Sequence, residues 1–107
     1  MLNRSSAKMV TILVLFATPS SAQDMDALER CSQVGAVAEV TMSARQSGIR
    51  KDVLLAALAQ SPDPELVHGI ITRAYEVIIW GDPILREIVV MDFSGQEELT
   101  CLDASGL

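Results

Sequence analysis

Apolar residues recur at helical spacing most clearly between residues 63 and 80. They cover about half of the helix circumference, which is more than one neighbouring helix can bury. These residues are Leu66, Val67, Ile70, Ile71, Ala74, Tyr75, Val77 and Ile78. Asp63 and Pro64 suit the N-cap and the first helical position, and Gly81 suits the left-handed position after the last turn. We therefore expect a helix over 63–80, placed at the centre of a small bundle.

Two helices are predicted before this segment. Asp26 can cap the first, and apolar residues at helical spacing continue from there to about Ser47, just before Gly48. The apolar face of this helix carries mostly small side chains, whereas Gln46 falls on its polar side. A shorter helix is expected over 49–60, where valine and leucine residues share one face. The small side chains of the first helix predict that a neighbouring helix approaches it closely.

The C-terminal part of the chain allows two interpretations. Asp82 and Pro83 repeat the arrangement of a cap followed by proline, which predicts a fourth helix from near Pro83 to about Phe93. A kink or short break is expected at 94–95, before a last helix. The alternative is a β-hairpin within 76–93, because this segment is rich in isoleucine and valine. The sequence thus favours an all-α bundle of four to five short helices, with an α+β fold as the alternative.

Residues 1–22 have the composition of an export signal. Two basic residues precede the apolar run 9–17, and the small residues Ser20 and Ala22 flank a cleavage point. The apolar run is much shorter than the about 20 residues of a membrane-spanning helix, although a retained membrane anchor is the alternative. We expect cleavage after Ala22, which leaves a single helical domain over 23–107 that does not contact the membrane.

The chain is acidic, with a formal net charge of −6. Residues 1–22 contain two basic residues and no acidic residue, so their removal changes this charge to −8. Nucleic-acid binding depends on neutralisation of phosphates, and anionic membrane surfaces also attract positive charge. The charge therefore argues against both partners and fits a soluble protein, or one that meets a basic partner.

Two cysteines, Cys31 and Cys101, lie near the two ends of the predicted domain. An even pair in a small exported domain most simply forms a disulfide, here between the first and last helices. Closing such a long loop contributes about 4 kcal/mol in the chain-entropy estimate. The absence of a Cys-x-x-Cys motif argues against a redox catalyst.

His68 is the only histidine in the chain. It forms a Glu-x-x-His pair with Glu65, a spacing found in di-iron bundles, but such a site needs a second copy of the motif. No serine lies in a nucleophile-elbow motif, and no pair of carboxylates is placed for acid–base catalysis. We therefore expect a protein that is not an enzyme and that needs no metal or other cofactor.

Hydrophobic side chains near the start of the fourth predicted helix suggest an interaction surface. Trp80 lies outside the main apolar arc, and Val89 and Phe93 lie opposite Ile84 and Ile88 on the fourth helix. Aromatic residues are enriched as anchors of protein interfaces. Trp80, Val89 and Phe93 are therefore predicted to form an exposed patch for dimerisation or for a partner. The alternative is that the last segment of the chain covers these side chains.

A second candidate surface is a small basic patch made of Arg45, Arg50 and Lys51. An anionic ligand or an acidic partner could bind there. The alternative is that Arg45 simply lies at the edge of the core, with its aliphatic stem buried and its charge near the C-terminus of its helix.

Several short segments give the chain a resemblance to other proteins. Cys31 lies early in the first helix, MSARQSG spans 42–48, AYE spans 74–76, and DF spans 92–93 before Cys101. This arrangement resembles a loose group of small exported proteobacterial and phage-associated proteins of unknown function. The resemblance implies a periplasmic, helical, disulfide-tied domain, and it implies no activity or functional residues.

The sequence predicts a small exported protein of the periplasm, or a secreted one, that acts by binding another protein or a second copy of itself. The alternative is a module that binds a small ligand or responds to envelope stress through the basic patch of Arg45, Arg50 and Lys51.

Overall fold

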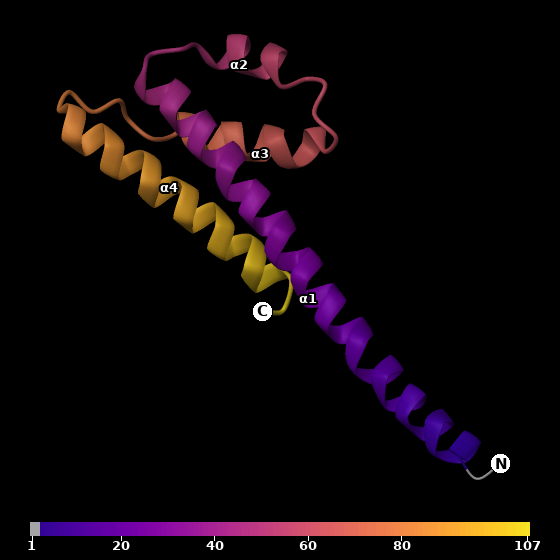
Figure 1. Cartoon of the computed structure of the whole chain (residues 1–107). Helices are drawn as coiled ribbons and strands as arrows, with labels where there is room; N and C mark the ends of the chain where they lie inside the picture. Colours follow the sequence, from indigo (N-terminus) through magenta and orange to yellow (C-terminus); the bar gives the residue numbers. More distant parts are fainter. Residues whose placement is uncertain (1–2) are drawn as a thin grey trace.

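The computed structural model describes the backbone of residues 3–107 and the side chains of residues 25–107. Within this range the chain forms four helices and no strand (Figure 1). The helices are α1 (Asn3–Gln46), α2 (Lys51–Ala57), α3 (Pro64–Tyr75) and α4 (Pro83–Ala104). The all-α prediction is confirmed, and the alternative hairpin within 76–93 is wrong. The predicted export signal, 1–22, lies outside the residues whose side chains are described, so its cleavage stays a prediction.

The helices are arranged around α1. α4 runs antiparallel along one side of α1, while α2 and α3 pack near its C-terminal half (Figure 1). α1 contacts all three other helices, and its contact with α4 is the most extensive. The expectation that the helix within 63–80 forms the centre of the bundle is therefore wrong, because the small side chains of α1 let other helices pack on more than one side of it.

Two hydrophobic clusters form the core along α1. One lies where α1 meets α2 and α3, and the other lies where α1 meets α3 and α4. The first comprises Ala44, Leu54, Val67 and Ile71, and the second comprises Val34, Ala38 and Ile70, with Phe93 and Cys101 packed against it. α4 itself contributes no buried residue. This helix therefore covers the core with one face and leaves the rest of its surface to solvent.

α1 and α4 approach each other closely at Gly35. A Cβ atom at this position would lie only 2.7 Å from the carboxylate of Glu98. The hydroxyl of Ser94 donates a hydrogen bond to the Gly35 carbonyl at 2.8 Å. The predicted close approach to the first helix is thus present, and α4 is the helix that makes it.

The start of α3 follows the prediction, but its end does not. The Asp63 side chain accepts a hydrogen bond from the Leu66 amide at 3.2 Å, and Pro64 occupies the first turn. α3 ends at Tyr75, so the predicted helix is too long at its C-terminal end. Gly81 does not have the expected left-handed conformation. Among the described residues, positive φ angles occur only at Gly48 and Gly106.

Gly48 ends α1 as predicted. Its φ angle of 82° lies in the left-handed region, where a residue with a Cβ atom would be strained. Its amide donates to the carbonyl of Arg45, and the Ile49 amide donates to the carbonyl of Ala44. These bonds satisfy carbonyl groups of the last turn of α1 and turn the chain towards α2.

α4 is one unbroken helix, so the break predicted at 94–95 is wrong. The Asp82 side chain accepts a hydrogen bond from the Ile84 amide at 2.8 Å, and Pro83 begins the helix as expected. Ser94 does not cap a new helix, because its hydroxyl bonds to α1 instead. The predicted disulfide is confirmed: Cys31 in α1 and Cys101 in α4 are bonded, with their Cα atoms 5.4 Å apart.

Candidate functional site

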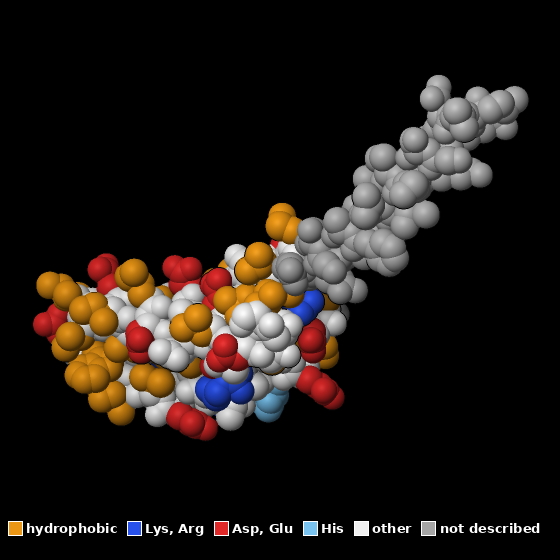
Figure 2. Space-filling view, turned by 90° about the horizontal axis from the view of Figure 1, so that it is seen from below, with side chains coloured by type: hydrophobic (Ala, Val, Ile, Leu, Met, Phe, Trp, Pro, Cys, Tyr) orange, Lys and Arg blue, Asp and Glu red, His pale blue; other side chains and the backbone are white. Residues whose placement is uncertain are grey.

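Large hydrophobic side chains are exposed at the end of the molecule where α4 begins. Figure 2 shows hydrophobic side chains gathered at this end. We call this region the apolar end surface, and it consists of Ile78, Ile79, Trp80, Ile84, Leu85, Ile88 and Met91. The exposed fraction reaches 68% for Ile84 and 72% for Met91. These values are far higher than expected for side chains that belong to a core.

The exposure of α4 follows from its position in the fold. Ile84, Ile88 and Met91 are spaced by about one helical turn, so their side chains lie in one row. Leu99, which is also exposed, continues this row, and we call the four residues the outer stripe of α4. α4 packs against α1 with its opposite face, while α2 and α3 lie elsewhere on α1. Nothing in the described part of the chain covers the outer stripe.

The segment between α3 and α4 is held in place by α1. The buried side chain of Gln46 donates a hydrogen bond to the Ile78 carbonyl at 2.8 Å and accepts one from the Trp80 amide at 3.0 Å. The guanidinium of Arg45 donates to the Val77 carbonyl at 2.9 Å. Arg86 of α4 also donates to the Trp80 carbonyl. These bonds hold the non-helical backbone between α3 and α4 in place, so Ile78 and Ile79 are exposed at a defined position.

Gln46 is the structural residue that the sequence pattern missed. Helical phase placed it on the polar side of α1, yet its exposed fraction is only 4%. A glutamine on the polar side of an amphipathic pattern is ordinarily solvated. Its burial could not be predicted, because it depends on two backbone groups from a segment more than thirty residues later in the chain.

The structure separates the three residues predicted to form an interaction patch. Trp80 is exposed within the apolar end surface. Val89 is half-buried, and Phe93 is half-buried against the cluster of Val34 and its neighbours. The exposed face of α4 is thus the face of Ile84 and Ile88, opposite to the expected one. Both faces of this helix are apolar, so the sequence pattern could not indicate which one α1 would cover.

The predicted basic patch is largely engaged within the chain. Arg45 is half-buried, bonds to the Val77 carbonyl and lies over the ring of Tyr75, with its guanidinium carbon 5.1 Å from the ring centre. Arg50 forms an exposed ion pair with Asp52 at 3.1 Å. Lys51 is exposed at the start of α2. Arg45 therefore stabilises the end of α1, and it does not present a free charge alongside the other two.

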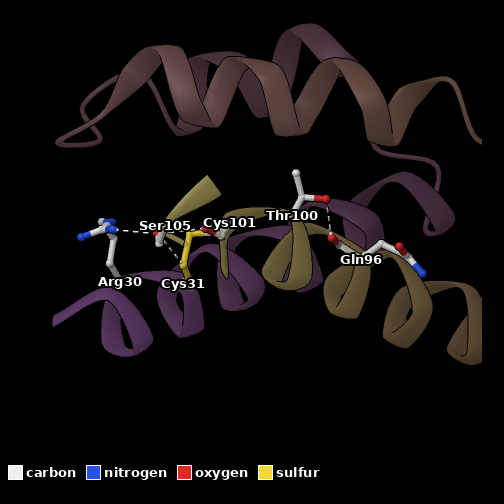
Figure 3. Close-up of a disulfide and its surroundings, with 6 residues drawn as sticks. All are labelled: Arg30, Cys31, Gln96, Thr100, Cys101 and Ser105. Carbon is white, nitrogen blue, oxygen red and sulfur yellow. Dashed lines mark hydrogen bonds between the residues drawn. A yellow bond between two sulfur atoms is a disulfide. The ribbon is translucent and has the colours of Figure 1, made fainter. Parts of the chain in front are cut away.

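A groove of about 420 Å³ lies beside the disulfide, between α3 and the pair formed by α1 and α4. Figure 3 shows Arg30, Thr100 and Ser105 near this disulfide. Arg30 donates to the Ser105 hydroxyl at 3.1 Å, and this hydroxyl donates to the Cys101 carbonyl at 2.9 Å. The polar groups beside the disulfide thus bond to one another. They stabilise the junction of the helices, and they are not free to bind a ligand in the groove.

An ion pair at the same groove links α3 to α4. Arg73 donates two hydrogen bonds to the carboxylate of Glu97, at 2.6 and 2.9 Å. Hydrogen bonding to Glu97 raises the pKa of the Arg73 guanidinium above its ordinary value, so the cation is favoured further. Because Arg73 is half-exposed, we expect this pair to contribute only modestly to stability.

The described residues show neither a metal centre nor a membrane span. Residues 25–107 contain no group of three or more histidine, cysteine or carboxylate side chains that could hold a metal ion. His68 is exposed on α3, where its backbone carbonyl accepts a hydrogen bond from Thr72. In this part of the chain no helix is both long and apolar enough to cross a membrane.

The fold and the surface together define a small all-helical protein whose first and last helices are joined by a disulfide and whose one end is apolar. Comparisons with protein-family models, with curated proteins and with solved structures found no match. The disulfide is compatible with an oxidising compartment outside the cytoplasm.

Proposed function

We propose that this protein acts by binding another protein through the apolar end surface. The observation that carries the proposal is the outer stripe of α4, where Ile84, Ile88 and Met91 are more than half exposed in one row. Single exposed hydrophobic residues are ordinary, but adjoining ones in a defined arrangement mark interaction sites on soluble proteins. The hydrogen bonds of Gln46 support the proposal, because they hold Ile78 and Trp80 next to this stripe.

We place this function in the periplasm or outside the cell. The support is the signal-like composition of residues 1–22 together with the disulfide between Cys31 and Cys101. Cleavage after Ala22 would leave a chain that begins at Gln23. Intact-mass measurement of the protein from a periplasmic extract tests this step, and a full-length membrane-bound species would contradict it.

The alternative function, binding of a small anionic ligand at Arg45, Arg50 and Lys51, has less support. Arg45 and Arg50 already have partners within the chain, at Val77 and Asp52. A ligand at this surface would have to replace those contacts, whereas a partner at the outer stripe displaces only water.

Site-specific photo-cross-linking tests the proposed function. A photoreactive phenylalanine derivative at position 88 should give a cross-linked adduct with another protein in living cells. The matched control is position 53, because Val53 is also exposed but lies on α2, away from the apolar end surface. An adduct that forms from position 88 and not from position 53 supports the proposal. No adduct from position 88, or equal adducts from both positions, would contradict it.

A further inference from the structure

Carboxylates border the outer stripe of α4 on both sides. Helical geometry places Glu87 and Glu98 along one edge of the stripe and Asp92 and Asp103 along the other. Arg86 is the single basic residue of α4, and its guanidinium donates to the Trp80 carbonyl. The apolar row therefore lies between two acidic borders, with little positive charge to balance them.

The edge of the stripe that faces α1 is hollowed into a groove of about 380 Å³. Val90 and Met91 give this groove an apolar part, and Glu39 of α1 and Glu87 of α4 add a carboxylate from each wall. Arg86 also lines the groove, with its guanidinium bound to the Trp80 carbonyl. Both glutamates are exposed. A long side chain with an aliphatic stem and a positive end would match this combination, because lysine and arginine bury their stems and keep their charge near water or near a carboxylate.

We propose that the partner presents a basic amphipathic helix to the outer stripe of α4. This inference rests on the proposed function and names the chemistry of its partner. Apolar residues of the partner helix pack on Ile84, Ile88 and Met91, while its lysine or arginine residues lie against Glu87 and Asp92. From position 84 to position 99 the stripe spans about 22 Å, which is enough for about four turns of a partner helix.

Charge also argues against a second copy of this chain as the occupant. Two outer stripes packed together would bring their acidic borders against each other, and like charges across an interface oppose association. A basic helix removes this repulsion and gains attraction along both borders. The same reasoning disfavours an anionic lipid surface.

Two synthetic peptides provide the direct test. One is an 18-residue helix of leucine and lysine, and the other is its matched version with glutamate in place of lysine, both without tryptophan. The chain contains a single tryptophan, Trp80, which lies within the apolar end surface, so its fluorescence reports binding there. We expect the lysine peptide to change the emission of Trp80 in a saturable way and the glutamate peptide to leave it unchanged.

Two pairs of substitutions separate local charge from net charge. Glu87→Gln with Asp92→Asn should weaken binding of the lysine peptide by about fivefold, as expected for the loss of two exposed ion pairs. The control, Glu29→Gln with Glu65→Gln, removes the same charge from exposed positions on α1 and α3. Its affinity should stay within about twofold of the unsubstituted protein. Equal weakening by both pairs would mean that net charge alone attracts the peptide, which overturns the proposal.

A third variant, Ile88→Ser with Met91→Ser, distinguishes a failure of the basic-helix proposal from a failure of the proposed binding surface. If both peptides bind equally and this variant binds neither, the apolar surface is a binding site but the basic partner is wrong. If neither peptide binds and the protein self-associates in sedimentation, a second copy is the occupant. If neither binds and the protein stays monomeric, the basic-helix proposal also fails. Circular dichroism should show that all variants keep their helices, because the substituted side chains are exposed.

Discussion

The side-chain carbonyl oxygen of Gln46 accepts a hydrogen bond from the backbone amide of Trp80, although two whole helices, α2 and α3, lie between these residues in the chain. The same glutamine donates to the Ile78 carbonyl. The end of α1 thus determines where the apolar segment before α4 lies. The position of the apolar end surface depends on this pair of contacts.

Gln46→Ala should lower the free energy of unfolding by about 1–3 kcal/mol, because the carbonyl of Ile78 and the amide of Trp80 lose their partner in a partly buried site. Urea unfolding followed by circular dichroism measures this change. Gln33→Ala, at an exposed position of the same helix, is the matched control and should change stability by less than about 0.5 kcal/mol. Equal effects of the two substitutions would show that Gln46 does not hold the segment.

Cys31→Ser with Cys101→Ser should lower the free energy of unfolding by about 2–5 kcal/mol, because the disulfide joins residues 70 positions apart. Unfolding curves of the two proteins, recorded without reductant, give the difference. Thiol titration of the unsubstituted protein should find no free thiol, and non-reducing electrophoresis should show a monomer. Free thiols or a disulfide-linked dimer would contradict the intramolecular pair.

The glycines at 35 and 95 should respond to alanine to different degrees. Gly95 has open space around it within α4, so Gly95→Ala should stabilise the protein by about 0.5–1 kcal/mol through helix propensity. At Gly35 the new Cβ atom would meet Glu98, so Gly35→Ala should gain less, and Gly35→Val should cost about 1–3 kcal/mol. Thermal unfolding measures all three. A stabilising Gly35→Val would mean that α1 and α4 are not in close contact.

Alkaline pH should destabilise the fold through Tyr75, the only tyrosine. Burial raises the pKa of its hydroxyl above the ordinary value of 10.0, and the charge of Arg45 opposes part of this effect. A raised pKa means that the folded state favours the protonated phenol, which donates to the Ile49 carbonyl at 2.6 Å. This stabilisation is present below the unfolded-state pKa and is lost as pH rises through the folded-state pKa.

Ultraviolet titration should therefore give a higher midpoint for Tyr75 in the folded chain than in the chain unfolded with urea. Tyr75→Phe is the control, since it should remove this part of the alkaline loss of stability. Identical midpoints in the two states would contradict the partly buried, hydrogen-bonded environment of the hydroxyl.

Local sequence rules predicted the parts of the fold that depend on neighbouring residues. Asp63 and Asp82 cap their helices, Gly48 ends α1, and Cys31 pairs with Cys101. In each case the decisive interaction is short-range or follows from the pairing of two cysteines. These features could be predicted because tertiary packing does not oppose them.

The end of α3 could not be predicted, because there a tertiary interaction outweighs a local pattern. Val77 and Ile78 continue the helical phase of the preceding residues, but their carbonyl groups bond to Arg45 and Gln46 of α1. Which face of α4 packs against α1 could not be predicted for a different reason. Its two faces are both apolar, and tertiary contacts, among them those of Gly35 and the disulfide, determine which face is covered.

Phe93→Ser and Ile88→Ser form a matched pair that separates core from surface on α4. Phe93 packs against the core cluster of α1 and α3, so its substitution should lower stability by about 1–3 kcal/mol. Ile88 is 54% exposed, so Ile88→Ser should change stability by less than about 0.5 kcal/mol while it removes partner binding. Chemical unfolding of both variants gives the comparison. A larger loss for Ile88→Ser would place the outer stripe in the core.

The oxidation rate of Met91 tests most directly whether the outer stripe of α4 is a binding surface. Met25 on α1 is 66% exposed and Met42 is fully buried, so they provide the fast and slow references within the same chain. In the purified protein we predict that Met91 is oxidised as fast as Met25, as measured by mass spectrometry after treatment with dilute peroxide. In the intact cell envelope Met91 should become protected while Met25 stays reactive. Slow oxidation of Met91 in the purified protein, or equally fast oxidation in both settings, would contradict the account.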